Sequence, residues 1–372
     1  MKRAVIIGYG NMGSKYAVRI YKGEIRDLSL YGIVCRNSTG QQEIRESMPE
    51  VIIYPETDSA FADCEKFDAI IITTPHKEHV RVVTKAQELG IHVLCEKPLG
   101  IMAQECKALS FDLTGVVCAM IFNWRARDIY RQVHDYLESG KLGRLHQVVW
   151  IANFWYRPEH YHKASAWRSS WGGEGGGLLI NQSQHLLDMW NWLFGQPCEV
   201  LARIAYGSYS KILVDDKVAL FFRHDNGMWG TFLSSSGDSP GTNHLEIHGE
   251  MGKLVVEDNC HVTLCQNEES TMRVSESSQE MFPKIPYETE CWEVKQEKDE
   301  YAVILQNFAD AMEGREEPLA TLSDGKRALE NTNAAYLSDW QGKAVAIPCD
   351  EEAYRLGLER MIIEEGQGNR AK

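Results

Sequence analysis

The stretch that decides the fold is an apolar run, residues 3–7, followed by Gly8-Tyr9-Gly10-Asn11-Met12-Gly13. The apolar run predicts a β-strand and residues 11–21 predict a helix, so the glycines lie on a strand-to-helix turn. In such a turn the first glycine permits the tight bend, the second lets the backbone approach a pyrophosphate, and the third lets the helix pack close to the strand. The helix N-terminus then faces the anion. We therefore expect all six residues to bind a dinucleotide; a plain tight turn is the alternative.

Strand and helix patterns alternate through the first part of the chain, which is typical of a doubly wound parallel sheet. The strand-like segments there are 28–35, 51–54, 68–73, 91–95 and 115–120, and the helical ones begin at 41 or cover 77–89 and 103–109. Later strand-like segments are separated by short turns, which predicts antiparallel pairing: 145–155, 199–206, 217–223, 230–234, 244–248, 253–257 and 261–265.

One long helix, 178–193, interrupts these later strands, residues 266–300 read as a long surface connection, and 301–313 and 323–337 read as helices. The predicted fold class is α/β, with a Rossmann domain followed by an α+β domain whose sheet is mostly antiparallel. The predicted ranges are 1–122 for the dinucleotide-binding domain, 123–350 for the substrate-binding and oligomerisation domain, and 351–372 for a charged tail.

Composition narrows the class of partner. The net charge of −14 argues against nucleic acid, whose phosphates would repel such a surface. No apolar run approaches the roughly 18 residues that a membrane helix needs, and the chain passes from Met1-Lys2-Arg3 straight into a strand rather than a signal peptide. Ten cysteines without a C-x-x-C pair indicate a reducing compartment, with neither a disulfide framework nor a zinc site. We expect a cytoplasmic protein with no nucleic-acid or membrane partner.

The end of the second predicted strand bears on the choice of cofactor. An acidic residue is expected there when the adenosine ribose carries a free 2′-hydroxyl, but the chain reads Val34-Cys35-Arg36-Asn37-Ser38. The guanidinium of Arg36 can stack on adenine and pair with a 2′-phosphate. We expect NAD(P)(H) as the cofactor, with Arg36 favouring NADP. A surface arginine beside an NAD site is the alternative.

Two further stretches follow predicted parallel strands, at the edge of the sheet where ligands bind in this architecture. They are Thr73-Thr74-Pro75-His76-Lys77-Glu78-His79 and Glu96-Lys97-Pro98. Lys97 lies one residue past a buried strand, and the proline after it fixes the turn. Beside a nicotinamide, Lys97 can act as an acid, a base or an anchor for a substrate hydroxyl.

A third stretch opens the long helix with three glycines, Gly175 to Gly177, and continues through Asn181 to His185. On a continuous helix residues 181 and 185 share one face, with Asp188 one turn further on. The glycines let the backbone pass close to something bulky. We expect Asn181 and His185 to serve catalysis; a packed core histidine is the alternative.

Taken together, the glycine loop, the Glu-Lys-Pro run and the glycine-led helix with His185 resemble the Gfo/Idh/MocA oxidoreductases, the family of glucose–fructose oxidoreductase and inositol dehydrogenases. The resemblance implies a Rossmann domain, a second domain with a large open sheet, and homodimers or homotetramers formed through that sheet. It implies that Lys97 is the active-site lysine and His185 the proton-transfer residue. It also assigns to the cofactor Thr73, Thr74, Pro75, His76, His79, Glu96, Lys97, Asn123, Trp167 and Arg168.

One departure matters, because many members carry Asp where this chain has Asn181. An asparagine can orient a substrate hydroxyl but supplies no charge to stabilise an imidazolium, so we expect a neutral His185 that acts as a base.

Aromatic and polar side chains precede the long helix, and such a mixture suits a sugar ring, whose C–H faces stack while its hydroxyls form hydrogen bonds. The expected substrate-binding residues are Lys97, Tyr156, Arg157, Trp167, Asn181 and His185. Neighbouring His160 and His162 lack a spacing for a third ligand, so we predict solvated loop histidines and no metal.

The predicted function is therefore NAD(P)-dependent oxidation or reduction at a secondary hydroxyl or ketone of a sugar, cyclitol or glycoside. Two alternatives stay open at this point. One is glycoside cleavage through a transient 3-keto intermediate, with no net change in the cofactor. The other is a non-catalytic protein that binds NAD(P) or a sugar as a sensor.

Overall fold

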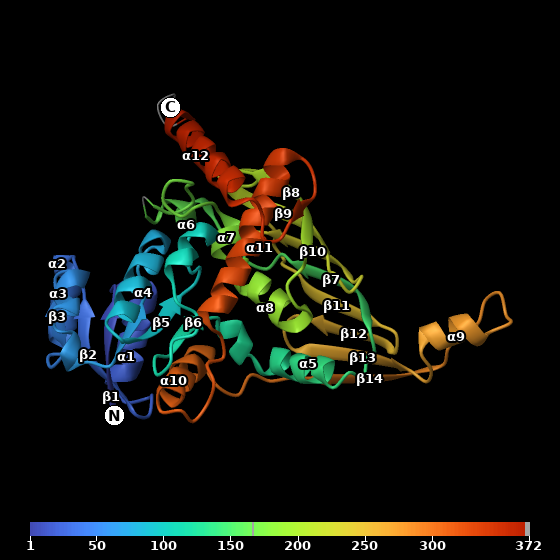
Figure 1. Cartoon of the computed structure of the whole chain (residues 1–372), viewed down its shortest axis with the longest axis horizontal. Helices are drawn as coiled ribbons and strands as arrows, with labels where there is room; N and C mark the ends of the chain where they lie inside the picture. Colours follow the sequence, from blue (N-terminus) through green and yellow to red (C-terminus); the bar gives the residue numbers. More distant parts are fainter. Residues whose placement is uncertain (166, 369–372) are drawn as a thin grey trace. The chain divides into compact units, whose positions relative to one another are not determined.

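The computed structural model describes residues 1–165 and 167–368. Its internal contacts divide the chain into two compact units (Figure 1). The first unit comprises Met1–Ala126 and Lys298–Leu329, and the second comprises Arg127–Glu297 and the chain from Glu330 onward. Within the described chain, no helix combines the length and the apolar character needed to cross a bilayer.

A six-stranded parallel sheet forms the centre of the first unit. Its strands are β1 (Lys2–Ile7), β2 (Leu28–Val34), β3 (Ile52–Tyr54), β4 (Ala69–Ile72), β5 (His92–Glu96) and β6 (Cys118–Ile121). They lie in the order β3-β2-β1-β4-β5-β6 with every neighbouring pair parallel. The order in which strands are added to the sheet reverses between β1 and β4, so the carboxyl ends of these two strands form the edge at which a dinucleotide binds in doubly wound sheets. The predicted fold class is confirmed here.

Helices cover this sheet and bury its apolar side chains. They are α1 (Asn11–Tyr21), α2 (Ser38–Ser47), α3 (Thr57–Phe61), α4 (His79–Glu88) and α10 (Glu300–Met312), with 3₁₀ turns η1 (Cys64–Lys66), η2 (His76–Glu78), η3 (Ala103–Ala108) and η4 (Asn123–Ala126). Although α10 is far along the chain, its Leu305 and Phe308 pack in the same core cluster as Ile6 and Ile33. The first unit is therefore completed by a segment that begins at Lys298, far along the chain from the end of β6 at Ile121.

A nine-stranded sheet forms the centre of the second unit. Its strands are β7 (Leu145–Ala152), β8 (Glu199–Tyr206), β9 (Asp215–Arg223), β10 (Trp229–Ser235), β11 (Asn243–Gly249), β12 (Gly252–Glu257), β13 (His261–Asn267), β14 (Tyr287–Glu293) and β15 (Val345–Ala346). The order is β14-β13-β12-β11-β7-β10-β9-β8-β15, and only the β7–β10 pair is parallel. The mostly antiparallel pairing predicted from the turns is confirmed.

The edge strand β14 was not predicted, because residues 266–300 read as a surface connection. The segment instead contains α9 (Thr271–Ser277) and β14, which pairs with β13 from Tyr287 to Glu293. The sequence of β14 carries glutamates and is exposed along almost its whole length. A charged, exposed edge strand resists pairing with other chains and has little of the apolar pattern by which strands are recognised.

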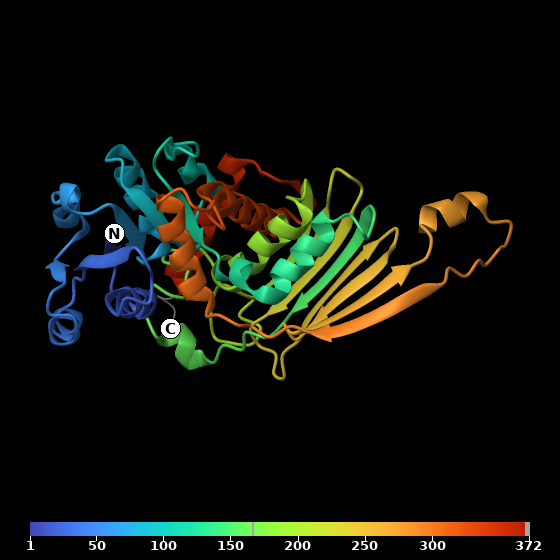
Figure 2. The ribbon, with the colours of Figure 1, turned by 90° about the horizontal axis from the view of Figure 1, so that it is seen from below.

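Helices lie on one face of this sheet, as Figure 2 shows for α5 (Asp128–Glu138) and α8 (Gln184–Phe194). The ring of Trp190 on α8 packs against that of Phe222, tilted by 47° with ring centroids 4.9 Å apart, and a side chain at Gly230 would collide with the Trp190 ring. The remaining helices are α6 (Glu159–Lys163), α7 (Leu178–Asn181), α11 (Leu322–Gln341), which crosses the boundary between the units, and α12 (Glu351–Gly368). The opposite face of the sheet exposes Phe221 and Trp229.

The long helix predicted over 178–193 is broken into α7 and α8. The amide of Ser183 donates to the carbonyl of Leu178, five residues earlier, at 2.9 Å, whereas the amide of Asn181 donates four residues back to Gly177 at 3.0 Å. One wider turn therefore interrupts the regular ladder, as in π-type bulges, which are frequent at functional sites. Because of this turn, Asn181 and His185 do not lie on one continuous helix, as the expectation that they share one face required.

Candidate active site

The glycine loop is shaped by contacts that only glycine permits. Gly8 has a φ of +108°, and a Cβ there would lie 3.1 Å from the carbonyl oxygen of Thr73. A Cβ on Gly13 would lie 2.1 Å from the carbonyl oxygen of Gly8, so the first turn of α1 is pressed against the loop. Around Gly10 the space within 4 Å is open. The loop thus leaves room for a ligand at its middle glycine and none at the other two.

The stretch after β4 supports this loop. The hydroxyl of Thr73 donates to the carbonyl of Gly8 at 2.8 Å, so this side chain braces the loop. The hydroxyl of Thr74 is buried and has no hydrogen-bond partner within the described residues. A buried polar atom without a partner at a ligand-binding edge is a position where a ligand group can complete the hydrogen bonding.

His79 links the two loops at this edge. Its Nδ1 lies 2.7 Å from the carbonyl oxygen of Pro98 and its Nε2 lies 2.7 Å from the carbonyl oxygen of Thr74. The ring is fully buried, and this burial lowers the pKa of His79 despite the two carbonyls. A neutral imidazole can donate to only one of these carbonyls at a time, but the ring lies against the backbone of both loops, which suits a residue that positions them. The nearby ring of His76 is also buried.

Lys97 follows β5 and is half-buried. The preceding carboxyl group, Glu96, accepts a hydrogen bond from the phenol of Tyr16 at 2.6 Å and from the amide of Lys97 at 3.1 Å. Burial raises the pKa of Glu96, while the charge of Lys97 acts in the opposite direction. The strand end that presents the lysine is thus fixed from α1, the helix that begins in the glycine loop.

Asn123 and Arg36 occupy two other positions in the first unit. Asn123 starts η4 after β6, is buried, and donates from Nδ2 to the carboxylate of Glu300, while its Oδ1 lacks a partner within the described chain. Arg36 is exposed between the end of β2 and Asn37, whose side chain caps α2 by accepting from the Gly40 amide at 2.6 Å.

In the second unit, the glycine run packs against the protein itself. A Cβ on Gly176 would lie 2.2 Å from the Tyr336 hydroxyl, and one on Gly177 would lie 2.2 Å from the backbone oxygen of Asp215. The buried carboxylate of Asp215 accepts from the amides of Gly177 and Leu179, each at 2.7 Å, and from the Tyr336 hydroxyl at 2.7 Å. The glycines were expected to let the backbone pass close to a bulky group, and that group is the pair formed by Asp215 and Tyr336.

His185 stands out from its surroundings by exposure. Every other residue from Leu178 to Trp190 is buried, and His185 alone is partly exposed. An imidazole at the accessible surface of an otherwise buried helical segment can exchange protons with a ligand or with solvent.

Asn181 belongs to a polar network that the sequence did not reveal. Its Nδ2 donates to the carboxylate of Glu174, which is 1% exposed, and also lies 3.3 Å from the Tyr161 hydroxyl. The same hydroxyl accepts from Gln182 at 2.8 Å and from Arg168 at 2.6 Å. A carboxylate therefore stands beside Asn181 even though an amide replaces the acid expected from the resemblance. Glu174 carried no motif by which it could have been singled out, whereas Tyr161 belongs to the aromatic and polar side chains expected to precede the helix.

Some of the side chains predicted to bind the substrate or the cofactor lie around the ring of Tyr161. The guanidinium carbons of Arg157 and Arg168 lie 4.8 Å and 4.5 Å from its ring centroid, and Arg168 also lies 5.1 Å from the ring of Trp167. Tyr156 is 54% exposed. His162, expected to be a solvated loop residue, is half-buried and its Nδ1 lies 2.7 Å from the Ser169 hydroxyl.

Comparison with known proteins gives consistent matches. The family model described as "Oxidoreductase family, NAD-binding Rossmann fold" matches residues 2–113, and the GFO/IDH/MocA C-terminal domain matches residues 130–255. The levoglucosan dehydrogenase of Pseudarthrobacter phenanthrenivorans is 26% identical over 50% of this chain. The matched stretch covers 54% of the length of that relative, so it spans only about half of it. The scyllo-inositol 2-dehydrogenase (NAD(+)) of Bacillus subtilis is 24% identical over 93% of this chain and 96% of its own length.

Among solved structures, the WlbA dehydrogenase from Bordetella pertussis, in complex with NADH and UDP-GlcNAcA, is similar with a TM-score of 0.75 and 22% identity, over 94% of this chain and 99% of that chain. A likeness at that identity establishes the fold. The glycine loop on a doubly wound sheet defines a protein of the NAD-binding Rossmann class. Within that class, the chain belongs to the Gfo/Idh/MocA family of oxidoreductases.

Proposed function

We propose that the protein is an NAD(P)-dependent oxidoreductase that acts on a secondary hydroxyl or ketone of a sugar, cyclitol or glycoside. The observation that carries this proposal is the position of Lys97, directly after β5 at the carboxyl edge of a sheet whose first strand leads into the glycine loop. Ligands of doubly wound sheets bind at that edge, so a lysine there stands where a cofactor-bound substrate reacts. The named activities of the levoglucosan and inositol dehydrogenases support the choice of substrate class.

The residues present fit a nicotinamide dinucleotide. Gly8 and Gly13 form a cradle in which a Cβ would collide, and Gly10 leaves open space for a pyrophosphate. The orphaned buried oxygens of Thr74 and Asn123 offer positions that a bound ligand can satisfy. The exposed Arg36 supports a preference for NADP, because a guanidinium after β2 can pair with a 2′-phosphate. The bound nicotinamide supplies the acceptor, or the donor, of a hydride.

Acid–base chemistry is assigned to Lys97 and His185, acting on the same substrate. In the oxidation direction one of them accepts the hydroxyl proton while a hydride leaves the same carbon, so that a ketone forms. Asn181, held by Glu174 and Tyr161, orients a substrate hydroxyl. The remaining cofactor contacts are assigned to Trp167 and Arg168, and the sugar contacts to Tyr156 and Arg157.

Assembly and location are part of the proposal. The open face of the nine-stranded sheet exposes large apolar side chains, which supports a homodimer or homotetramer formed through it. All ten cysteines are free, which supports a cytoplasmic location.

The test is a direct one. Purified protein is titrated with NAD and NADP by fluorescence, and then mixed with a panel of sugars, inositols and glycosides while reduced cofactor is followed at its absorbance band. We expect binding of at least one nicotinamide cofactor and net reduction with one substrate class. Release of an aglycone without net reduction would instead indicate cleavage through a 3-keto intermediate, and cofactor binding without any product would indicate a sensor.

A further inference from the structure

The second unit carries an arm, residues 268–286, between β13 and β14. Figures 1 and 2 show α9 and the loop after it extending away from the end of the sheet. The arm has a defined base, because the amide of Glu268 donates to the carbonyl of Pro286 at 3.0 Å and the amide of Thr271 donates to the carbonyl of Glu250 at 3.0 Å. Backbone hydrogen bonds therefore anchor the base of the arm to the rest of the second unit, so the arm is not a frayed end of the sheet.

The tip of the arm is apolar and uncovered. Met281 is 87% exposed and Phe282 is 84% exposed, and α9 buries no side chain. Pro283 and Pro286 follow, and prolines lack the amide needed to extend a sheet. The tip is thus unsuited to strand pairing, and two large apolar side chains held in water favour insertion into a complementary site.

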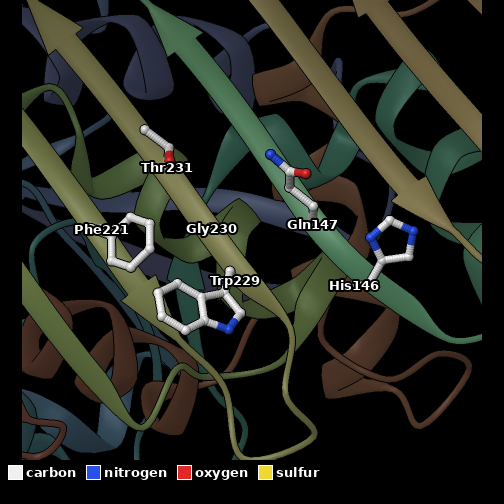
Figure 3. Close-up of a pocket in the computed structure, with 6 residues that line it drawn as sticks. All are labelled: His146, Gln147, Phe221, Trp229, Gly230 and Thr231. Atoms are coloured by element: carbon white, nitrogen blue, oxygen red, sulfur yellow. The ribbon is translucent and has the colours of Figure 1, made fainter.

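The open face of the sheet offers such a site. Phe221 and Trp229 form an edge-to-face pair with ring centroids 4.8 Å apart, and they are 38% and 50% exposed. Figure 3 shows these rings on β9 and β10, with Gln147 and His146 of β7 across from them. Together with Gly230 and Thr231, these side chains line a hollow of about 340 Å³. That volume is sufficient for a phenyl ring, and the aromatic wall suits one.

Charge favours the same pairing. The arm contains four glutamates against one arginine and one lysine, so it is acidic. On β8 and β9 the sheet face around Phe221 presents Arg203, Lys217 and Arg223, of which Arg223 pairs with Glu199. On the other side of the hollow Glu246 of β11 is paired with Lys253 at 2.7 Å. An acidic arm disfavours an anionic membrane surface and suits the positive charge of β8 and β9.

We propose that the arm of one chain docks on the open sheet face of a second copy, with Phe282 in the hollow formed by Phe221 and Trp229. The exchange is reciprocal, because each copy carries both the arm and the hollow, and two identical contacts close a dimer. This inference deepens the proposed assembly through the sheet, and it does not depend on the proposed chemistry.

The experiment replaces Phe282 with the photoreactive residue benzoylphenylalanine in the full chain. Unlabelled and ¹⁵N-labelled protein are mixed, equilibrated and irradiated, and the adducts are identified by mass spectrometry. We expect adducts that join a light chain to a heavy chain and connect the arm to residues 215–235. Adducts confined to one isotopic species, adducts to another surface, or no adduct would each overturn the proposal.

Sedimentation velocity over a range of concentrations provides a second readout. Phe282→Asp and Trp229→Asp should each raise the dissociation constant of the dimer by about tenfold or more, because each removes a buried aromatic contact. Leu356→Asp, on an α12 side chain that is 53% exposed, is the matched control and should leave association unchanged. A monomeric wild type, or an equal effect of all three substitutions, would contradict the inference. Cofactor binding and turnover are measured separately, so a failure of the docking proposal is distinguishable from a failure of the enzymatic one.

Discussion

The phenol of Tyr16 donates a hydrogen bond to the carboxylate of Glu96 at 2.6 Å, which joins the helix of the glycine loop to the residue before Lys97. Both groups are buried, and burial raises the pKa of each. The other carboxylate oxygen accepts from the backbone amide of Lys97. Glu96 is therefore a positioning residue that couples the cofactor loop to the lysine.

Removing this link should affect both stability and turnover. Tyr16→Phe leaves the buried Glu96 without one donor, which costs about 1–3 kcal/mol of the free energy of unfolding. We expect kcat to fall several-fold while cofactor affinity changes little, measured by thermal melts, fluorescence titration and steady-state kinetics. Tyr54→Phe is the control, because its phenol donates at 3.1 Å to Asp63, a partly exposed carboxylate. Unchanged turnover in Tyr16→Phe would refute the coupling.

The pH dependence of stability should report on Glu96. Burial raises the pKa of Glu96 in the folded protein, so the folded state holds this proton more tightly than the unfolded chain does. The stability that the neutral carboxyl contributes is present below its ordinary pKa and is lost as pH rises through the raised value. Glu96→Gln, which cannot ionise, should therefore lose less stability than the wild type between pH 4 and 8 in denaturant melts. Parallel curves for the two proteins would show that ionisation of Glu96 is not coupled to folding.

Arg36 should decide between the two nicotinamide cofactors. Hydrogen bonds to charged groups contribute about 1.5–3 kcal/mol, so Arg36→Ala should lower the NADP/NAD ratio of kcat/KM by about 10- to 100-fold. Arg45→Ala, an exposed arginine on α2, is the matched control and should leave the ratio unchanged. The same ratio in wild type and Arg36→Ala would remove the argument for NADP.

The glycine run before α7 should tolerate no side chain. A Cβ on Gly177 would lie 2.2 Å from the backbone oxygen of Asp215, so Gly177→Ala should destabilise the fold by about 1–3 kcal/mol or more. Gly366→Ala in α12 is the control, since the space there is open and alanine favours a helix by up to about 1 kcal/mol. Equal midpoints of urea unfolding for the two variants would contradict the packing described.

Local patterns made much of the fold predictable. The glycine loop and the parallel strands each depend on neighbours a few residues away, and the fold predicted from them was confirmed. The role predicted for Lys97 stays a prediction. The contacts that surround the candidate site could not be predicted, because they join distant positions. Tyr16 and Glu96 are 80 residues apart, and Asn123 and Glu300 are 177 apart.

The break between α7 and α8 was hidden for a different reason. Residues 181–185 are all polar and interrupt the apolar pattern, but hydrophobic periodicity alone does not distinguish a wider turn from a continuous helix over so short a stretch. The network of Glu174 with Asn181 likewise depends on how the glycine run folds back, which composition does not reveal. The edge strand β14 was missed because its exposed, charged sequence resembles a loop.

We propose that Lys97 and His185 act on one substrate, and a double-mutant cycle tests this proposal most directly. The kcat/KM of Lys97→Ala, His185→Ala and the double variant is compared with the wild type, with cofactor binding verified in each by fluorescence. Each single change should reduce kcat/KM by about 10²- to 10⁴-fold, and the double variant should be little worse than either, since residues that act as a unit are not additive. Losses that multiply in the double variant, or a single variant with wild-type turnover, would contradict the account.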